Sequence, residues 1–191
     1  MARRNPQSLS TGAKVAIAIG AGLGVFLLTR SAFGMGSSEP IADKLSEKWK
    51  KKMNASRLAI VAIIEEEFRN AGLGERVIGA AIANAWVESG LNPNAIGDNG
   101  ASVGLFQLHK RGAGTGLSVE FRKDPRNNTK TILEREVLAK RGNTLRTREK
   151  EGAGVGELAA IFSRDIERPA ATQHNMKLRK ALAEEMFPTL A

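Results

Sequence analysis

The pattern of hydrophobic positions separates an apolar N-terminal segment from a longer region of mixed polarity. The fifteen residues Val15–Thr29 carry no charge. As a helix they would span about 22 Å, which is shorter than the ~30 Å hydrocarbon core of a membrane. Extended to Met35, with Arg30 reaching the interface, the helix would span about 31 Å. We therefore predict a single transmembrane helix that forms a membrane anchor within residues 1–35.

A cleaved signal segment is the alternative for residues 1–35, because a basic start and an apolar core are typical of both. Arg30 stands where small residues should lead to a cleavage site, which favours the uncleaved anchor. A buried helix is a third, weaker possibility. Ala16, Gly20 and Gly24 form a stripe of small residues that would allow two such helices to pack as a homo-oligomer, although Gly-rich composition alone explains the stripe equally well.

Residues 36–54 have a different character. The segment 34–40 is rich in Gly and Ser and predicts a flexible hinge. Residues 41–53 are strongly basic and predict a helical stalk, whose charges face solvent or touch anionic lipid headgroups. The folded domain is then expected to occupy residues 55–191.

Within this domain, hydrophobic residues recur at helical spacing. Asn54 is a good N-cap for a helix to about Asn70, and Gly90 closes a second helix over residues 75–89. Residues 92–108 contain Pro and several Gly, which predicts turns with short extended pieces. Further helices are expected over residues 125–141, 155–167 and 170–187. The predicted fold class is α+β, mostly α.

Composition and charge limit the binding partners and the types of active site that the chain can have. The chain has 29 basic and 20 acidic residues, a formal net charge of +9, and therefore favours polyanions such as nucleic acid, anionic lipid or the acidic bacterial wall. It has no Cys and two His, which excludes a thiol nucleophile and argues against metal centres. We expect no cofactor. The basic runs lack interleaved aromatic residues, so no specific nucleic-acid partner is expected.

Glu88 is the strongest catalytic candidate. It falls on the same helical face as Val77, Ala81 and Ala85, in the last turn before Gly90. An apolar face and the negative end of the helix dipole both disfavour an ionised carboxylate, so both should raise the pKa of Glu88. A carboxylic acid that stays protonated near neutral pH can protonate a glycosidic oxygen. An ordinary surface Glu near a helix end is the plain alternative.

The residues around Glu88 resemble the goose-type lysozyme and soluble lytic transglycosylase superfamily. Its Glu-Ser-Gly, Asn-Pro and Ala motif is present as residues 88–90, 92–93 and 95, and its Gly-Leu-x-Gln turn as residues 104–107. The stretch Gly97-Asp98 with Gly100 is similar to the phage virion-associated, peptidoglycan-degrading variant. Residues 124–128 match the superfamily's Asp-Pro-x-x-Asn helix start, and residues 162–169 resemble a Phe…Glu-Arg-Pro stretch of phage tail-type lysozymes.

The resemblance implies a lysozyme-like catalytic domain in which Glu88 acts as general acid and then as general base. It places Ser89 near the N-acetyl group of the substrate and Gln107 in the cleft through hydrogen bonds that hold the loop. Asp98 is the second catalytic candidate, with a plain turn role as the alternative. Ser102 is also expected to bind substrate. The chain has no Tyr, so Phe162 takes the place that a Tyr holds in many transglycosylases, again as a substrate-binding residue.

The resemblance thus implies a lytic transglycosylase or a lysozyme that cleaves the MurNAc-GlcNAc β-1,4 bond of peptidoglycan strands. A phage-borne enzyme of this kind would open the wall locally, during genome delivery or for lysis. The expected location is the virion membrane or the bacterial inner membrane, with the catalytic domain facing the cell wall. The alternative is a non-enzymatic virion or envelope protein that retains the fold for glycan binding.

Overall fold

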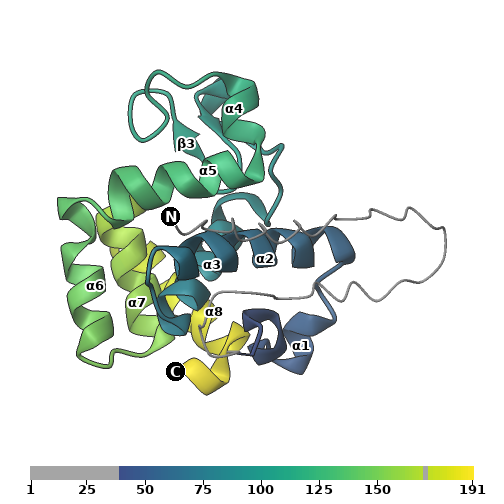
Figure 1. The fold of residues 1–191 in the computed structure, drawn as a ribbon, viewed down its shortest axis with the longest axis vertical. Coiled ribbons are helices and arrows are strands. Elements are labelled where there is room, and N and C mark those ends of the chain that lie inside the picture. Colours follow the sequence, from purple (N-terminus) through teal and green to yellow (C-terminus); the bar gives the residue numbers. More distant parts are fainter. Residues whose placement is uncertain (1–38, 170–171) are drawn as a thin grey trace, which may run out of the picture. The chain divides into compact units, whose positions relative to one another are not determined.

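A computed structural model describes residues 39–169 and 172–191 (Figure 1). The predicted membrane anchor and the small-residue stripe therefore lie outside the described residues. Among the residues that are described, no helix combines the length and apolarity that a membrane crossing requires.

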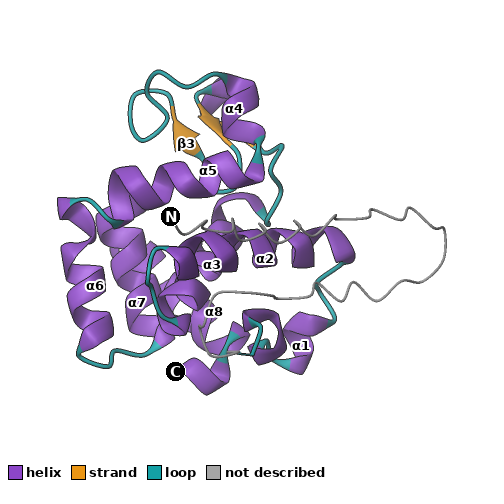
Figure 2. Cartoon of the chain, viewed as in Figure 1, coloured by secondary structure: helices purple, strands orange, loops and turns teal. Residues whose placement is uncertain are grey.

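The described chain is mostly helical with a small antiparallel sheet, which confirms the predicted α+β class (Figure 2). The α-helices are α1 (Glu47–Lys50), α2 (Ala55–Asn70), α3 (Glu75–Ser89), α4 (Val119–Lys123), α5 (Pro125–Ile132), α6 (Asn143–Lys150), α7 (Val155–Ile161) and α8 (Thr172–Met186). Two π-helical turns, Leu133–Val137 and Phe162–Glu167, continue α5 and α7. The helix expected over residues 125–141 therefore ends four residues early.

Helix α3 forms the centre of the helical core, where it contacts α2, α7 and α8. Its residues from Val77 to Ala85 are all buried. A helix that is apolar on every side must be surrounded by other elements, and the small residues of α3 let them approach closely. A Cβ at Gly79 would lie 3.0 Å from a methyl carbon of Val155 on α7.

The sheet consists of β1 (Ile96–Gly97), β2 (Ser102–Val103) and β3 (Leu108–His109), paired antiparallel in chain order. The strands lie beside α4 and α5 (Figure 2). Each strand has only two residues, so the sheet depends on its connecting turns and on side-chain hydrogen bonds. The predicted turns with short extended pieces are confirmed.

The segment predicted as a stalk packs onto the domain instead. Its apolar residues recur every fourth position, and all four are buried: Ile41, Leu45, Trp49 and Met53. The Trp49 ring packs edge-on against Trp86 of α3 with centroids 4.9 Å apart, and its indole N–H donates to Glu185 of α8. The high number of lysines in this segment obscured the apolar stripe in the sequence, because the lysines lie at the positions between its four residues.

Replacement of Trp49 tests this packing. We expect Trp49→Ala to lower the free energy of unfolding by about 3 kcal/mol or more, because a buried ring and its hydrogen bond are lost. Lys51→Ala is the matched control on the exposed side of the same segment and should change the value by less than about 0.5 kcal/mol. Denaturant unfolding of the full-length chain measures both. Equal effects of the two changes would mean that the segment does not belong to the folded domain.

Candidate active site

Glu88 lies in the last turn of α3, where the sequence places it. The helix ends at Gly90, which adopts the left-handed conformation (φ 63°) and donates its N–H to the Trp86 carbonyl. Glycine adopts this conformation without steric cost. The Glu88 side chain is 22% exposed, whereas the residues of the same helix from Val77 to Ala85 are buried.

An arginine from α8 contacts the Glu88 carboxylate. Nη2 of Arg179 lies 2.5 Å from Oε1 of Glu88, and the arginine side chain is only 2% exposed. Its Nη1 donates to Oδ1 of Asn84, one turn earlier on α3, at 3.0 Å. The Asn84 amide in turn donates to the carbonyl oxygens of Ala80 and Ala159. The guanidinium is therefore held in a fixed position beside Glu88.

A second carboxylate shares this arginine. Oε2 of Glu167, in the π-helical turn after α7, lies 2.6 Å from Nη1 of Arg179, and its side chain is 5% exposed. Burial raises the pKa of the Glu167 carboxyl well above its usual range, and the neighbouring Glu88 raises it further, while Arg179 opposes the shift. Three helical elements thus bring two carboxyl groups and one guanidinium together.

Ser89 joins the first motif to the second. Its hydroxyl lies 2.9 Å from the carbonyl oxygen of Leu105 and 3.0 Å from that of Ala85. A hydroxyl has a single hydrogen to donate, so the two carbonyls share it. The contact ties the Gly-Leu-x-Gln turn to the end of α3, next to Glu88.

Gln107 holds its own turn closed, as the resemblance implies. Its side-chain amide donates to the carbonyl oxygens of Gly104 at 2.9 Å and Ala95 at 3.3 Å. Two glycines make room for this turn. Gly104 has φ 86°, and a Cβ there would lie 2.2 Å from the Arg122 carbonyl oxygen. A Cβ at Gly97 would lie 2.4 Å from the Gln107 side-chain oxygen.

Asn128 explains the Asp-Pro-x-x-Asn motif. It is fully buried on α5, accepts a hydrogen bond from the Phe106 N–H, and donates to the carbonyl oxygens of Val103 and Arg122. Asp124 caps the same helix by accepting from the Asn127 N–H at 2.8 Å. The motif therefore fixes α5 to the turn that contacts Ser89, next to Glu88.

Asp98 and Ser102 form a separate pair. Asp98 is exposed and left-handed (φ 49°), and its carboxylate accepts a hydrogen bond of 2.5 Å from the Ser102 hydroxyl. Ser102 itself is buried on β2, with 4% exposure. Asp tolerates the left-handed conformation better than most residues. The pair closes the turn between β1 and β2.

Phe162 lies in the core. Its side chain is fully buried in the π-helical turn after α7, and its ring centroid lies 6.0 Å from that of Phe106. A fully buried ring offers no surface to a glycan. The prediction that Phe162 binds substrate therefore has no support in this geometry, because the ring packs in the core beside Phe106.

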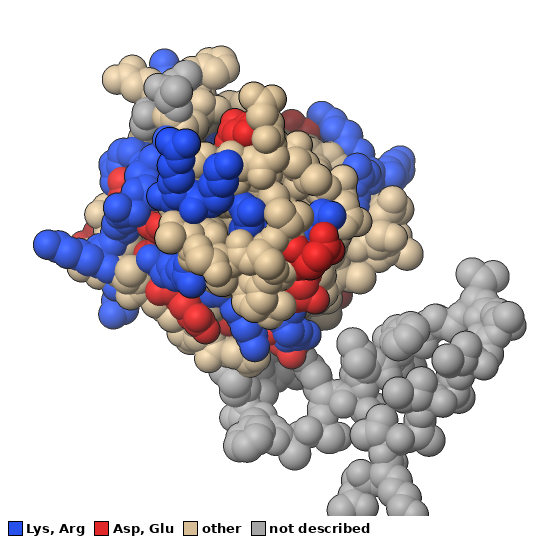
Figure 3. Space-filling model, turned by 90° about the horizontal axis from the view of Figure 1, so that it is seen from above, with Lys and Arg blue, Asp and Glu red and all other residues tan. Residues whose placement is uncertain are grey.

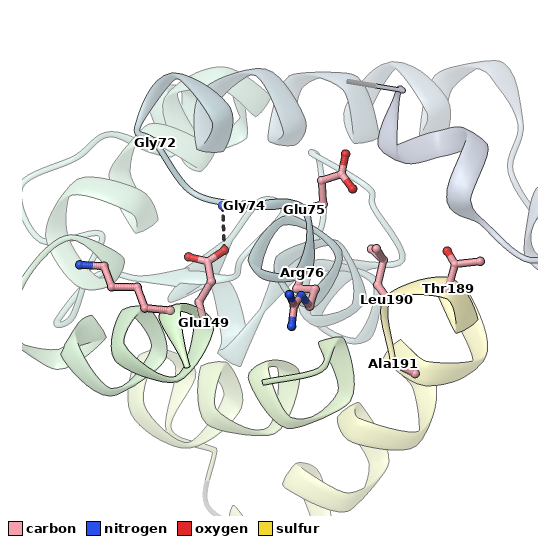
Figure 4. Close-up of a pocket in the computed structure, with 9 residues that line it drawn as sticks. Gly72, Gly74, Glu75, Arg76, Glu149, Thr189, Leu190 and Ala191 are labelled. Carbon is pink, nitrogen blue, oxygen red and sulfur yellow. Dashed lines mark hydrogen bonds between the residues drawn. The ribbon is translucent and has the colours of Figure 1, made fainter. Parts of the chain in front are cut away.

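A cavity of about 740 Å³ lies elsewhere (Figure 4). It is lined by residues at the N-terminal end of α3, including Gly74 and Arg76, and by Glu149 of α6, which accepts from the Gly74 N–H at 2.7 Å. A helix as long as α3 separates its two ends by roughly 20 Å. This cavity is therefore distinct from the site around Glu88.

On the face that Figure 3 shows, several patches of basic side chains lie among other residues, with acidic side chains between them. Several pair with neighbours, as Arg164 does with Asp165 at 2.5 Å, and Arg168 with Glu136 at 3.5 Å. Asp165 thus pairs with its neighbour in the chain. Glu167 does not pair with the adjacent Arg168 but with Arg179 in the interior.

A model of the phage tail lysozyme family matches residues 59–190. This match spans more than half of the chain and includes Glu88, Glu167 and Arg179. The chain belongs to the phage tail lysozyme family. No curated protein and no solved structure matches the chain. The family implies peptidoglycan degradation in the phage tail, and the match confirms the lysozyme-like resemblance that the motifs indicate.

Three residues of this candidate site are not predicted from the sequence: Asn84, Glu167 and Arg179. Glu167 lies inside the stretch that resembles phage tail-type lysozymes, so a signal was present, but its neighbour Arg168 offered an obvious partner. Asn84 precedes Glu88 by one helical turn on a buried helix, where a polar residue needs a partner. Arg179 is 91 positions from Glu88, and nothing in its local sequence distinguishes it from the other basic residues of α8.

Asn128→Ala tests the turn that contacts Ser89, next to Glu88. We expect the free energy of unfolding to fall by at least about 2 kcal/mol, because buried backbone groups lose their hydrogen-bond partners. Wall-degrading activity should fall as well, since the Gly-Leu-x-Gln turn loses its anchor. Asn127→Ala, one position earlier on α5, is the matched control and should alter stability by less than about 0.5 kcal/mol. Equal losses in the two variants would contradict the anchoring role.

Proposed function

We propose that this domain is a glycosidase that cleaves the β-1,4 bond between MurNAc and GlcNAc in peptidoglycan strands. The observation that carries the proposal is the Glu88 carboxyl group, which a buried helix presents at the surface beside the Gly-Leu-x-Gln turn. The family supports peptidoglycan as the substrate. A glycosidase requires a carboxyl group placed to protonate the oxygen that links two sugars.

In the first step, Glu88 donates its proton to the glycosidic oxygen. The carbon–oxygen bond breaks, its electron pair goes to the leaving oxygen, and positive charge develops on the remaining sugar ring. The Glu88 carboxylate formed in this step stabilises that charge. In the second step, the same carboxylate removes a proton from the attacking hydroxyl, which belongs to water in a lysozyme and to the 6-hydroxyl of the sugar in a lytic transglycosylase.

The surroundings of Glu88 suit this chemistry because they restrict its movement. Arg179 and Asn84 hold one side of the site, while Ser89 holds the turn on the other. A catalytic group that is already in place loses little entropy when the reaction begins. Gln107 and Ser89 act here through the backbone that they fix.

The site of action follows from the family and the predicted anchor together. We propose that the domain opens the wall locally from the phage particle or from the inner membrane, during genome delivery or lysis. The N-terminal segment 1–35 would supply the membrane tether. The net charge of +9 suits binding to the acidic wall.

Glu88→Gln tests the proposed acid. The amide has nearly the same shape but delivers no proton, so clearance of purified peptidoglycan should fall by at least about 10²-fold. Circular dichroism should show an unchanged fold. Glu120→Gln, at an exposed carboxylate of α4, is the matched control and should retain wild-type activity. Near wild-type clearance by Glu88→Gln would refute the enzymatic proposal.

Asp98→Asn tests whether a second carboxylate takes part. Because the Asp98 carboxylate is engaged with Ser102 in an exposed turn, we expect a loss of less than about tenfold, or ~1.4 kcal/mol of barrier. Ser102→Ala removes the same hydrogen bond from the other side and should match it. A hundredfold loss in Asp98→Asn alone would identify Asp98 as the base that activates water.

Mass spectrometry of the released muropeptides completes the test of Asp98. A small effect together with 1,6-anhydro ends means that the sugar's own hydroxyl attacks. Reducing ends mean that water attacks, and a large Asp98 effect with such ends would make the enzyme a hydrolysing lysozyme with two catalytic carboxyl groups.

A further inference from the structure

One buried arginine contacts two carboxyl groups at nearly equal distances. Arg179 lies 2.5 Å from Glu88 through Nη2 and 2.6 Å from Glu167 through Nη1. The arginine and Glu167 are almost inaccessible, with side-chain exposures of 2% and 5%, whereas Glu88 is 22% exposed. The three groups form one electrostatic unit, in which only Glu88 meets the surface.

The charge of this unit requires a proton. Two ionised carboxylates against one guanidinium would leave a net negative charge in the interior, which is strongly unfavourable. Neighbouring charges do not compensate for it. Arg164 and Arg168, next to Glu167 in the chain, pair with Asp165 and Glu136, while Lys180 on α8 pairs with Glu184. A single proton on one carboxyl group makes the unit neutral.

The direction of the pKa shift favours Glu167 as the site of this proton. Burial raises the pKa of the Glu167 carboxyl, and the neighbouring Glu88 raises it further, while Arg179 lowers it. No donor among the described residues makes a well-directed hydrogen bond to either Glu167 oxygen. The neighbouring Glu88 side chain is a hydrogen-bond partner that raises the pKa of Glu167, because a protonated Glu167 can donate to it. With the proton on Glu167, a neutral unit leaves the negative charge on Glu88, the more exposed of the two carboxyl groups.

This charge distribution poses a problem for the proposed mechanism, since Glu88 must hold a proton when the glycosidic bond breaks. We propose that Glu167 stores this proton and passes it to Glu88, and that Arg179 keeps the unit neutral during this transfer by contacting both carboxyl groups. The proposal rests on the proposed function of Glu88 and names Glu167 and Arg179 as positioning residues, because neither needs to touch the glycan.

The transfer conserves charge. The O–H bond of Glu167 breaks, its electron pair stays on Glu167, and a new O–H bond forms on the Glu88 carboxylate. Arg179 then faces an ionised Glu167 at 2.6 Å instead of an ionised Glu88 at 2.5 Å. Because these distances are so similar, the attraction of the guanidinium for the negative charge changes little between the two states.

Substrate binding would favour the state in which the proton lies on Glu88. A glycan strand over Glu88 would exclude the water that solvates its carboxylate, and desolvation disfavours the charged form. The proton then moves to Glu88, where the reaction needs it. The proton would therefore reach the reacting carboxyl group only when a strand covers it.

The pH dependence of wall degradation by the full-length chain tests the proposal. The Glu167→Gln variant has no carboxyl group at this position to hold the proton. Arg179 then stabilises only one carboxylate, that of Glu88. Glu88 must then take its proton from solvent, so the alkaline limb of the pH profile of kcat/KM should move to lower pH by at least about one unit. Activity should fall at least tenfold on the alkaline side and recover toward acidic pH.

Asp165→Asn, in the same π-helical turn, is the matched control and should keep the wild-type profile. Equal loss at every pH in Glu167→Gln, or no change of profile, would overturn the proposal while leaving the general acid intact. The proposed function fails separately, if Glu88→Gln remains active.

A measurement on the wild type does not depend on folding of any variant. Carbon-13 NMR of the glutamate carboxyl groups, assigned residue by residue in the full-length chain, should show Glu167 protonated at neutral pH. Glu149, whose pKa is also raised by burial, serves as an internal comparison outside the site. An ionised Glu167 at neutral pH would refute proton storage.

Discussion

The burial of α3 is the constraint on which the rest of the structure depends. A helix with apolar residues on every side must be enclosed by α2, α7 and α8, and its last turn must still present a charged group at the surface. The structure meets both requirements with Arg179, a buried guanidinium that Asn84 orients and that balances the charge of Glu88. The geometry around Glu88 and the packing of the core therefore share the same contacts.

The family motifs act here mainly through backbone geometry. Ser89 ties the turn to α3, Gln107 closes the turn, and Asn128 fixes it to α5. Each uses its polar atoms to satisfy buried or partly buried backbone groups, which are costly to leave without partners. These three motif residues thus hold together the backbone that lies next to the Glu88 carboxyl group.

The segment before α2 links the N-terminal region to the same core. Trp49 packs on Trp86, two positions before Glu88, and donates to Glu185 on α8, the helix that also carries Arg179. A backbone hydrogen bond from Ser46 to Met186 strengthens the link. The chain that leads from the predicted anchor is therefore attached to elements that position the site, rather than to a remote surface.

Local signals determined much of this protein from sequence alone. The Asn54 cap, the Gly90 stop and the glycine-rich turns identified α2, α3 and the strands, because caps and left-handed positions depend on neighbouring residues. The same signals located Glu88. The helix predicted through residue 141 was wrong at its end, because the helix stops at Val137 after a π-helical turn.

Only the tertiary structure decided which charges meet. Arg179 and Glu167 come from elements distant from α3 in sequence, and the burial that gives Glu167 a raised pKa arises when α3, α7 and α8 pack together. The burial of Trp49 inside a basic segment likewise depends on its contacts with α3 and α8. Long-range pairing and desolvation are properties of the packed core, so no local pattern of residue types contains them.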